Sequence, residues 1–203
     1  MMTIGLTGGI ACGKTQVREE FERLGAATLD ADLLARQAVE PGQPAFGGIV
    51  EAFGDEVLTA QGEIDRKKLA EIVFRDQKAR RTLNSIVHPE VFRLQDEWLQ
   101  ALQSGPPSER PALVLIDAAL MIEVGSYTRF DVLVVVHCSL QEQLQRLIKR
   151  DGISRQQAQQ RIDSQMPVSE KISYADHLID NNGPPEETRR QVREVYEKLQ
   201  ERL

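Results

Sequence analysis

The chain has 203 residues, of which 41% are hydrophobic and 28% are charged, a balance typical of a globular protein. Its length favours one domain with insertions over two independent folds. The net charge of -6 argues against nucleic-acid binding, because counterion release requires a concentrated positive surface. The most continuous apolar run, residues 132–136, is too short to cross a membrane, and no basic leader precedes an apolar stretch at the start. We therefore expect a cytoplasmic protein without a nucleic-acid, membrane or obligate protein partner.

Short apolar segments separated by helices predict a parallel sheet of about five strands. A strand over residues 3–7 precedes a helix that carries Val17, Phe21 and Leu24 on one face and ends at Gly25. Apolar strands that alternate with helices are typical of an α/β fold with helices on both faces of the sheet. The remaining strands are predicted at residues 26–29, 112–116, 132–137 and around 178–179.

Two helical regions interrupt this alternation. Residues 33–104 have helical character throughout and predict an insertion, which ends in the Pro- and Gly-containing loop 104–107. Capping-box patterns predict the starts of two helices after the fourth strand, and Pro167 is expected to end the second of them. These patterns are Ser139 with Glu142 and Ser154 with Gln157. The final helix is predicted at residues 186–203.

The strongest functional signal is the loop Gly8-Gly9-Ile10-Ala11-Cys12-Gly13-Lys14-Thr15, which has Walker A spacing between a strand and a helix. The backbone N–H groups of such a loop point at phosphate oxygens, and the helix N-terminus adds to the attraction. We expect Lys14 to reach the β- and γ-phosphates and the Thr15 hydroxyl to bind Mg²⁺, whereas Gln16 donates only its backbone N–H. A chance match in a glycine-rich turn is the alternative, which the flanking strand and helix disfavour.

Among proteins with this loop, the sequence favours a small ATP-dependent kinase. The Asn-Lys-x-Asp motif of GTPases is absent, and the chain is too short for a large ATPase motor. Kinase chemistry needs a carboxylate that orients or deprotonates the acceptor hydroxyl. Asp30 and Asp32 follow the second strand, and alternation would place both on one side, with Asp32 the better base. Either could instead cap a helix that starts at Leu33.

Further charged residues could complete the site. Asp117 ends the third strand, the position of a Walker B aspartate that holds Mg²⁺ or its water shell, although an ordinary strand-end residue is the alternative. Arg146 and Arg150 lie four residues apart and share one helix face, which could close over ATP as a lid. For Arg161 and Lys171 we expect only a solvated charged surface.

Several motifs follow one another along almost the entire chain. The most specific is Leu29-Asp30-Ala31-Asp32-Leu33-Leu34-Ala35-Arg36. The others are residues 6–10, 62–66, 88–91, 120–123, 146–150, 165–167 and 175–181. Taken together, these motifs resemble the dephospho-CoA kinase family, a family of P-loop small-molecule kinases.

The resemblance implies one kinase domain in three parts and a specific reaction. The parts are a core (about 1–32, 111–139 and 174–203), a helical CoA-binding insertion (about 33–110) and a lid (about 140–173). The reaction transfers the γ-phosphoryl group of ATP, with Mg²⁺, to the ribose 3′-hydroxyl of dephospho-CoA, the last step of CoA synthesis. A kinase for nucleosides, nucleotides or a sugar acid is the alternative, followed by an ATP-binding regulatory module.

The same resemblance suggests roles for individual residues. Asp32 aligns with the family's catalytic carboxylate. In the insertion, Arg36, Arg66 and His88 could approach the phosphates or the ribose of the acceptor. For His88, a helix-start position before Pro89 is the alternative.

The chain departs from the family's usual pattern at three positions. The family has Gly-Ser where this chain has Ala11-Cys12, and proline where it has Ala119. If position 11 requires a positive φ, alanine adds strain there, although we expect function to be retained.

The two cysteines, Cys12 and Cys138, lie in different sequence contexts and suggest neither a disulfide framework nor a zinc site. Because Cys12 lies beside a helix N-terminus, we hypothesise that its pKa is depressed and that thiol reagents block it unless ATP is bound. The alternative is that Cys12 is simply a small residue in the place of serine.

Overall fold

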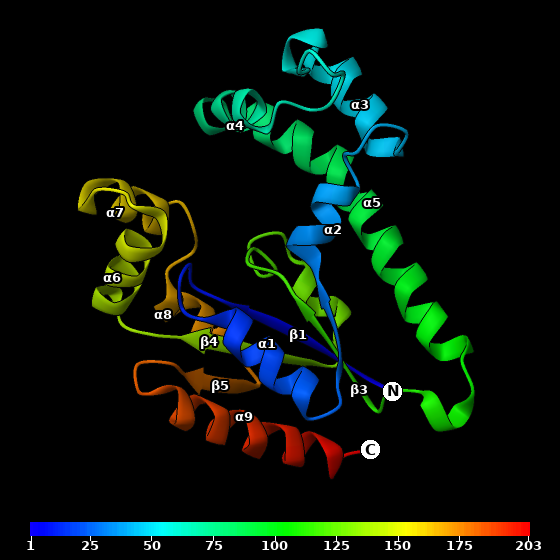
Figure 1. Ribbon diagram of the computed structural model, residues 1–203, viewed down its shortest axis with the longest axis vertical. Coiled ribbons are helices and arrows are strands. Elements are labelled where there is room, and N and C mark those ends of the chain that lie inside the picture. Colours follow the sequence, from blue (N-terminus) through cyan, green and yellow to red (C-terminus); the bar gives the residue numbers. More distant parts are fainter. The chain divides into compact units, whose positions relative to one another are not determined.

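Five parallel strands form one sheet in the order β2-β3-β1-β4-β5 (Figure 1). They are β1 (Met2–Gly8), β2 (Ala27–Asp30), β3 (Leu113–Asp117), β4 (Val132–His137) and β5 (His177–Asp180). Because every pair is parallel, the carboxyl ends of all five strands lie at the same edge of the sheet. The predicted parallel α/β fold is confirmed, and the observed strand ends differ from the predicted ones by at most one residue.

The computed structural model describes residues 1–203, apart from the side chain of Phe74, and the chain forms two compact units. The first unit comprises residues 1–30 and 109–203 and contains the sheet, and the second comprises residues 31–108. Helices of the first unit are α1 (Lys14–Arg23), α6 (Leu140–Asp151), α7 (Arg155–Asp163), α8 (Val168–Lys171) and α9 (Pro185–Gln200). No helix in the described part of the chain is long and apolar enough to span a membrane.

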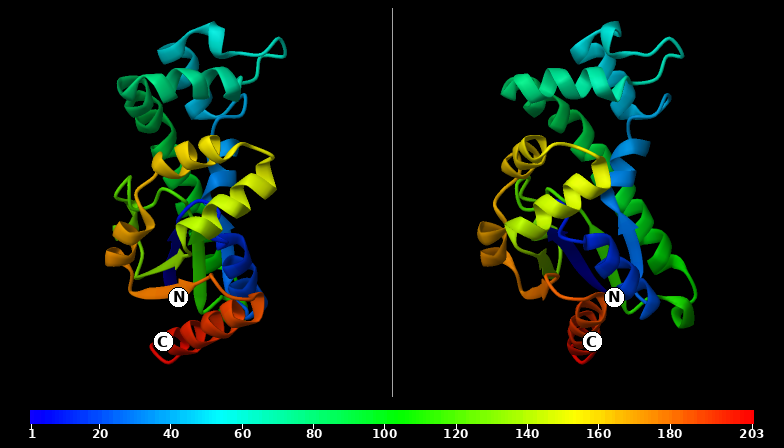
Figure 2. Two further views of the ribbon diagram at one scale, coloured as in Figure 1. Left: turned by 90° about the vertical axis from the view of Figure 1, so that its left-hand side faces the viewer. Right: turned by 60° about the vertical axis from the view of Figure 1, so that its left-hand side comes forward.

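Alternation along the strands divides the core of the first unit between the two faces of the sheet. On one face, side chains such as Ile4 and Val134 pack against α1 and α9. The helix α9, red in Figure 2, lies next to α1 and β5. On the other face, Leu133 and Val135 pack against Met121 from the segment after β3. Because both faces are covered, β3 and β4 are continuous apolar runs.

The second unit is built from four helices around its own apolar core. These are α2 (Ala31–Gln37), α3 (Pro44–Phe53), α4 (Arg66–Arg75) and α5 (Gln77–Ser104). The core contains Ile49, Val57, Ile64 and Leu69. The prediction of helix throughout residues 33–104 is therefore wrong where the chain turns between α3 and α4, at a bridge between Leu58 and Ile64.

Helix α5 runs through Pro89, so the alternative that His88 lies at a helix start is wrong. Proline lacks an N–H group and normally interrupts a helix. Packing of α5 against α2, α3 and α4 offsets this cost. Sequence propensity alone could not reveal that support.

The capping predictions are confirmed at one helix and half confirmed at the other. Ser154 and Gln157 form the complete capping box of α7. At α6, Ser139 accepts a hydrogen bond from the Glu142 N–H, but the Ser139 N–H donates to Asn182 Oδ1 instead of Glu142. Helix α7 ends at Asp163, ahead of the predicted stop at Pro167, and α9 ends three residues before residue 203. Short 3-10 turns occur at Asp55–Val57, Pro107–Glu109, Ser126–Arg129 and Ile172–Tyr174.

Candidate active site

The loop between β1 and α1 is fixed by close packing at both of its ends. Gly8 lies so near β4 that a Cβ atom there would come within 2.3 Å of the Val136 carbonyl oxygen. Gly13 has a φ of 87°, a left-handed conformation that favours glycine, and a Cβ there would lie 2.0 Å from Asn181 Nδ2. Local geometry therefore requires a glycine at both positions of the Walker A motif.

Ala11 lies in the middle of this loop with a φ of 60°, a positive value that no other non-glycine residue of the described chain has. The expectation that position 11 needs a positive φ is thus confirmed. A left-handed conformation costs an L-residue about 1–2 kcal/mol, because its Cβ approaches the following carbonyl oxygen. The surrounding packing must compensate for this strain.

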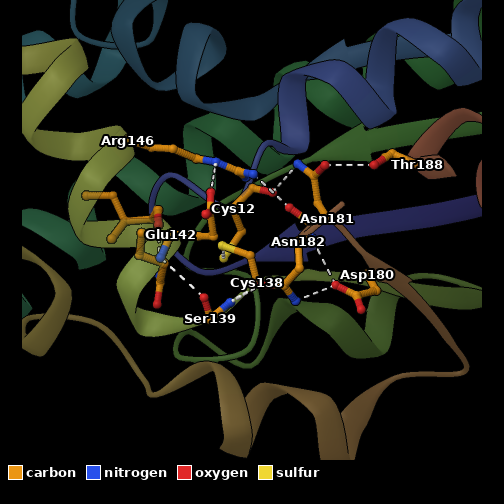
Figure 3. A network of polar contacts seen from close by, with 11 residues as sticks. Cys12, Cys138, Ser139, Glu142, Arg146, Asp180, Asn181, Asn182 and Thr188 are labelled. Atoms are coloured by element: carbon orange, nitrogen blue, oxygen red, sulfur yellow. Dashed lines mark hydrogen bonds and ion pairs between the residues drawn. The ribbon is translucent and has the colours of Figure 1, made fainter. Parts of the chain in front are cut away.

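Three side-chain amides from distant segments hold the loop by its backbone. Gln143 from α6 donates to the Ile10 carbonyl oxygen at 2.8 Å, and the Ile10 N–H donates to Gln165 Oε1 at 3.1 Å. Asn181, after β5, donates to the Cys12 carbonyl oxygen at 2.8 Å (Figure 3). The loop is therefore oriented before any ligand binds.

Opposite charges gather where the first turn of α1 meets the carboxyl ends of β2 and β3. Lys14 Nζ lies 3.7 Å from Asp117 Oδ1, and Arg18 Nε lies 3.8 Å from Asp117 Oδ2. Arg18 also lies 3.9 Å from Asp30 Oδ2, because the sheet register places Asp30 beside Asp117. Two cations and two carboxylates thus stand together next to the Walker A loop, residues 8–15, which we call the phosphate loop after its motif.

The oxygen atoms in this cluster suit a divalent cation that arrives with a nucleotide. No group of three or more His, Cys, Asp or Glu residues in the described chain could enclose a metal. Mg²⁺ usually binds through one or two protein oxygens, with phosphates and waters as its other ligands. Asp117 lies in this cluster and Thr15 follows Lys14 in α1, and both side chains carry hard oxygen atoms of the kind that this mode of binding uses.

Nearly the whole chain, residues 2–187, matches the family model described as CoaE: Dephospho-CoA kinase. The chain belongs to the dephospho-CoA kinase family. A dephospho-CoA kinase of Geobacter metallireducens is 50% identical over 192 residues, which are 95% of this chain and 94% of that relative. The structure of TT1252 from Thermus thermophilus has a TM-score of 0.82 at 32% identity, and the match covers 98% of this chain and 97% of the TT1252 chain. Dephospho-CoA kinase from Campylobacter jejuni has a TM-score of 0.69 at 28% identity, with coverages of 97% and 96%. The resemblance drawn from the motifs is therefore confirmed.

Arg146 and Arg150, which were predicted to share one helix face, have different partners in this member of the dephospho-CoA kinase family. Arg146 donates to the Asn181 carbonyl oxygen at 2.8 Å and points toward the phosphate loop (Figure 3). One of its guanidinium nitrogens would lie 3.8 Å from a Cβ at Gly13. The Arg150 side chain, 58% exposed, pairs instead with Asp151 at 2.7 Å. The structure thus brings only Arg146 to the loop.

Lys171 is completely buried, so its assignment to a solvated surface is wrong. Its ammonium group lies 2.8 Å from a Glu123 carboxylate oxygen and donates to the Ala119 carbonyl oxygen at 2.8 Å. Burial lowers the pKa of Lys171, against the opposing effect of Glu123. The Met166 N–H donates to the same carboxylate at 3.1 Å. Arg161 is exposed, as predicted.

Asp30 and Asp32 do not share one side of a strand. Strand β2 ends at Asp30 and α2 begins at Ala31, so the alternation argument is wrong. The helix also begins two residues before the predicted Leu33, which puts Asp32 inside its first turn rather than at its cap. Asp30 directly precedes α2, the position that the capping alternative requires.

The three residues predicted to approach the acceptor all lie in the second unit. Arg36 and Arg66 line a pocket of about 570 Å³, and Arg66 donates to the Arg36 carbonyl oxygen at 3.2 Å. His88 is not among the described residues that line this pocket. It lies in α5 beside Phe92, with ring centroids 6.1 Å apart, and burial lowers its pKa.

Sequence reasoning missed Arg18 and the amide side chains that hold the loop. Arg18 follows Lys14 by four residues on α1, so helical spacing could have identified it. Gln165 and Asn181 lie in the motifs at residues 165–167 and 175–181, but nothing in the sequence connected them, or Gln143, with the loop, because all three act from more than a hundred residues away.

Cys12 and Cys138 are free thiols, and their contact in the structure was not predicted from their different sequence contexts. The Cys138 thiol donates to the Cys12 sulfur at 3.2 Å. Parallel pairing of β1 with β4, which sets Gly8 beside Val136, brings the segments after both strands together. The hydrogen bond from Cys138 is the main cause of a lowered pKa at Cys12, and the same contact together with burial raises the pKa of Cys138.

Proposed function

We propose that this chain transfers the γ-phosphoryl group of ATP to the ribose 3′-hydroxyl of dephospho-CoA, giving CoA and ADP. The observation that carries the proposal is the placement of Lys14 and Arg18 around Asp117, beside a Walker A loop, in a chain of this family. Phosphoryl transfer by such enzymes depends mainly on positioning and on charge neutralisation. The cluster supplies charges for both tasks.

For ATP, the backbone N–H groups of residues 8–13 and the Lys14 ammonium would hold the phosphates. The Thr15 hydroxyl and the Asp117 carboxylate would hold Mg²⁺, which when bound offsets negative charge on the β- and γ-phosphates. Gln16 would contribute its backbone N–H only, because its side-chain amide donates to a backbone carbonyl of α9 at 3.3 Å.

For the acceptor, we assign Asp32 as the carboxylate that orients the 3′-hydroxyl and accepts its proton as the oxygen attacks the γ-phosphorus. It lies two residues after the end of β2. The carboxyl ends of strands in open parallel sheets border the ligand crevice. This location supports the assignment.

The helical unit would bind the rest of dephospho-CoA. Arg36 and Arg66 line one pocket, and guanidinium groups match phosphate oxygens in geometry. We propose His88 only as a neutral hydrogen-bonding group, because its lowered pKa disfavours the cation. Residues 140–173 would act as a lid that brings Arg146, and after closure Arg150, to the transferring phosphate.

The test is ADP release from the purified protein with Mg·ATP, with and without dephospho-CoA, followed by mass analysis of the product. We expect release that depends on dephospho-CoA and a product one phosphate heavier. Asp32→Asn should abolish turnover with little change in ATP affinity. Turnover that requires a nucleoside or a sugar acid would refute the proposed acceptor, and full activity of Asp32→Asn would refute the proposed base.

A further inference from the structure

A thiol of the phosphate loop is in contact with a second buried thiol. Cys12 belongs to the loop itself and Cys138 follows β4, and their sulfur atoms are 3.2 Å apart (Figure 3). Both are free thiols. Cys138 also lines a cavity of about 640 Å³ bounded by the ends of β4 and α6 and by α7 and α8. A small oxidant can therefore approach the pair through this cavity, although the protein shields both sulfurs from larger reagents.

We propose that Cys12 and Cys138 form a reversible disulfide under a peroxide oxidant, and that this bond inactivates the phosphate loop. In the first step a peroxide oxygen bonds to the Cys138 sulfur, the O–O bond breaks, and the thiol proton leaves with hydroxide as water. In the second step the Cys12 sulfur attacks the Cys138 sulfur, the S–O bond breaks, and a second water leaves. Two thiols and one hydrogen peroxide thus give one disulfide and two waters.

Access selects Cys138 for the first step, because it lines the cavity, although its raised pKa slows its reaction with peroxide. The electrostatics of the pair suit the second step. The lowered pKa of Cys12 favours its thiolate, which is the attacking species in the second step. Lys14 also favours this thiolate by its positive charge. In a reducing compartment thiols remain reduced, and disulfides that do form there are usually transient or regulatory.

Closing the bond draws Cys12 and Cys138 together and so acts on the loop. A disulfide holds its sulfurs at about 2.05 Å, so the present separation of 3.2 Å has to shrink by about 1 Å. Cys138 is restrained by its neighbours, because the His137 carbonyl accepts from the Asn181 N–H and the Ser139 N–H donates to Asn182. Part of the movement therefore falls on Cys12, and it strains the hydrogen bond from Asn181 to the Cys12 carbonyl oxygen.

Displacement of the loop by this amount changes how its N–H groups meet the phosphates. Misplacement by about 1 Å can lower the rate on the order of 100-fold. The strained Ala11 and the closely packed Gly13 flank Cys12, so the loop has little freedom to absorb the shift locally.

The experiment compares the reduced wild-type protein with the same protein treated with hydrogen peroxide. Expected results are a mass lower by two hydrogen atoms, a linked pair of peptides containing Cys12 and Cys138, weaker ATP binding and turnover lower on the order of 100-fold. Dithiothreitol should reverse all four changes. It would not repair oxidised methionines, because methionine sulfoxide is reversed by dedicated reductases.

The matched control is Cys138→Ser, which leaves the loop sequence intact. This variant should keep its basal activity and resist the same peroxide treatment. Absence of the cross-link, a cross-linked protein with unchanged ATP binding, or equal inactivation of Cys138→Ser would each overturn the proposal. Because mass and ATP binding are measured without dephospho-CoA, these results are independent of the proposed acceptor.

Discussion

Replacement of Lys171 by methionine tests whether its buried ion pair stabilises the first unit. The side chain is 0% exposed, whereas its partner Glu123 is 21% exposed. Removing one member of a buried pair typically costs 3–5 kcal/mol, because the other charge remains without compensation. Since Glu123 keeps the Met166 N–H and some contact with water, we expect the lower end, about 3 kcal/mol. For a chain of this size, that corresponds to a fall in Tm of about 6–12 °C.

The assay is urea and thermal unfolding followed by circular dichroism, with Lys149→Met as the control. Lys149 is an exposed lysine on α6, so its loss should change stability by less than about 0.5 kcal/mol. Adding Glu123→Gln to Lys171→Met removes the uncompensated charge and should recover about 1 kcal/mol or more. A loss below about 1 kcal/mol for Lys171→Met, or no recovery in the double variant, would refute the buried pair.

Three further changes address the phosphate loop and the helical unit. Ala11→Gly should relieve the positive φ and raise the free energy of unfolding by about 0.5–1 kcal/mol, because the gain exceeds glycine's entropy cost. Asn181→Ala should cost about 2–3 kcal/mol and weaken ATP binding, because the Cys12 carbonyl and the Thr188 hydroxyl lose their partner. His88→Asn should make stability less sensitive to acid. Burial lowers the pKa of His88 in the folded state, so the wild type loses stability as pH falls below about 6.5, when the unfolded chain binds a proton first.

For each of these three predictions, one experimental result would contradict it. Destabilisation by Ala11→Gly in urea titrations would mean that the loop does not hold a positive φ in solution. Unchanged ATP affinity in Asn181→Ala would show that the amide does not orient the loop. Parallel stability curves for wild type and His88→Asn between pH 7 and pH 5 would place the His88 pKa at its ordinary value.

The sequence was sufficient for local features whose cause is local. Apolar runs located the strands, and glycine spacing between a strand and a helix located the loop. Even the positive φ of Ala11 could be anticipated, because the family usually has glycine there. These features depend on a few neighbouring residues, so they appear in a short window of sequence.

Features that depend on strand order, on packing between distant segments or on the exact start of a helix could not be predicted. The Cys12–Cys138 contact requires β1 beside β4, and spacing along the chain does not encode that neighbour relation. Lys171 lies in a four-residue helix, which is too short to show an apolar face, so its burial left no pattern. The alternation argument for Asp32 failed because the helix began directly after β2.

The strand order also affects how the protein folds during synthesis. The central strand β1 is made first, yet its two neighbours, β3 and β4, begin only at Leu113 and Val132. The helices at residues 31–108 contact one another within one contiguous segment and can form early, since local contacts close quickly. The apolar β1 must then remain without its partners until more than half of the chain has left the ribosome. The phosphate loop at its end therefore belongs to the last part of the protein to reach its final form, and we expect chaperones to act on the nascent chain at this strand.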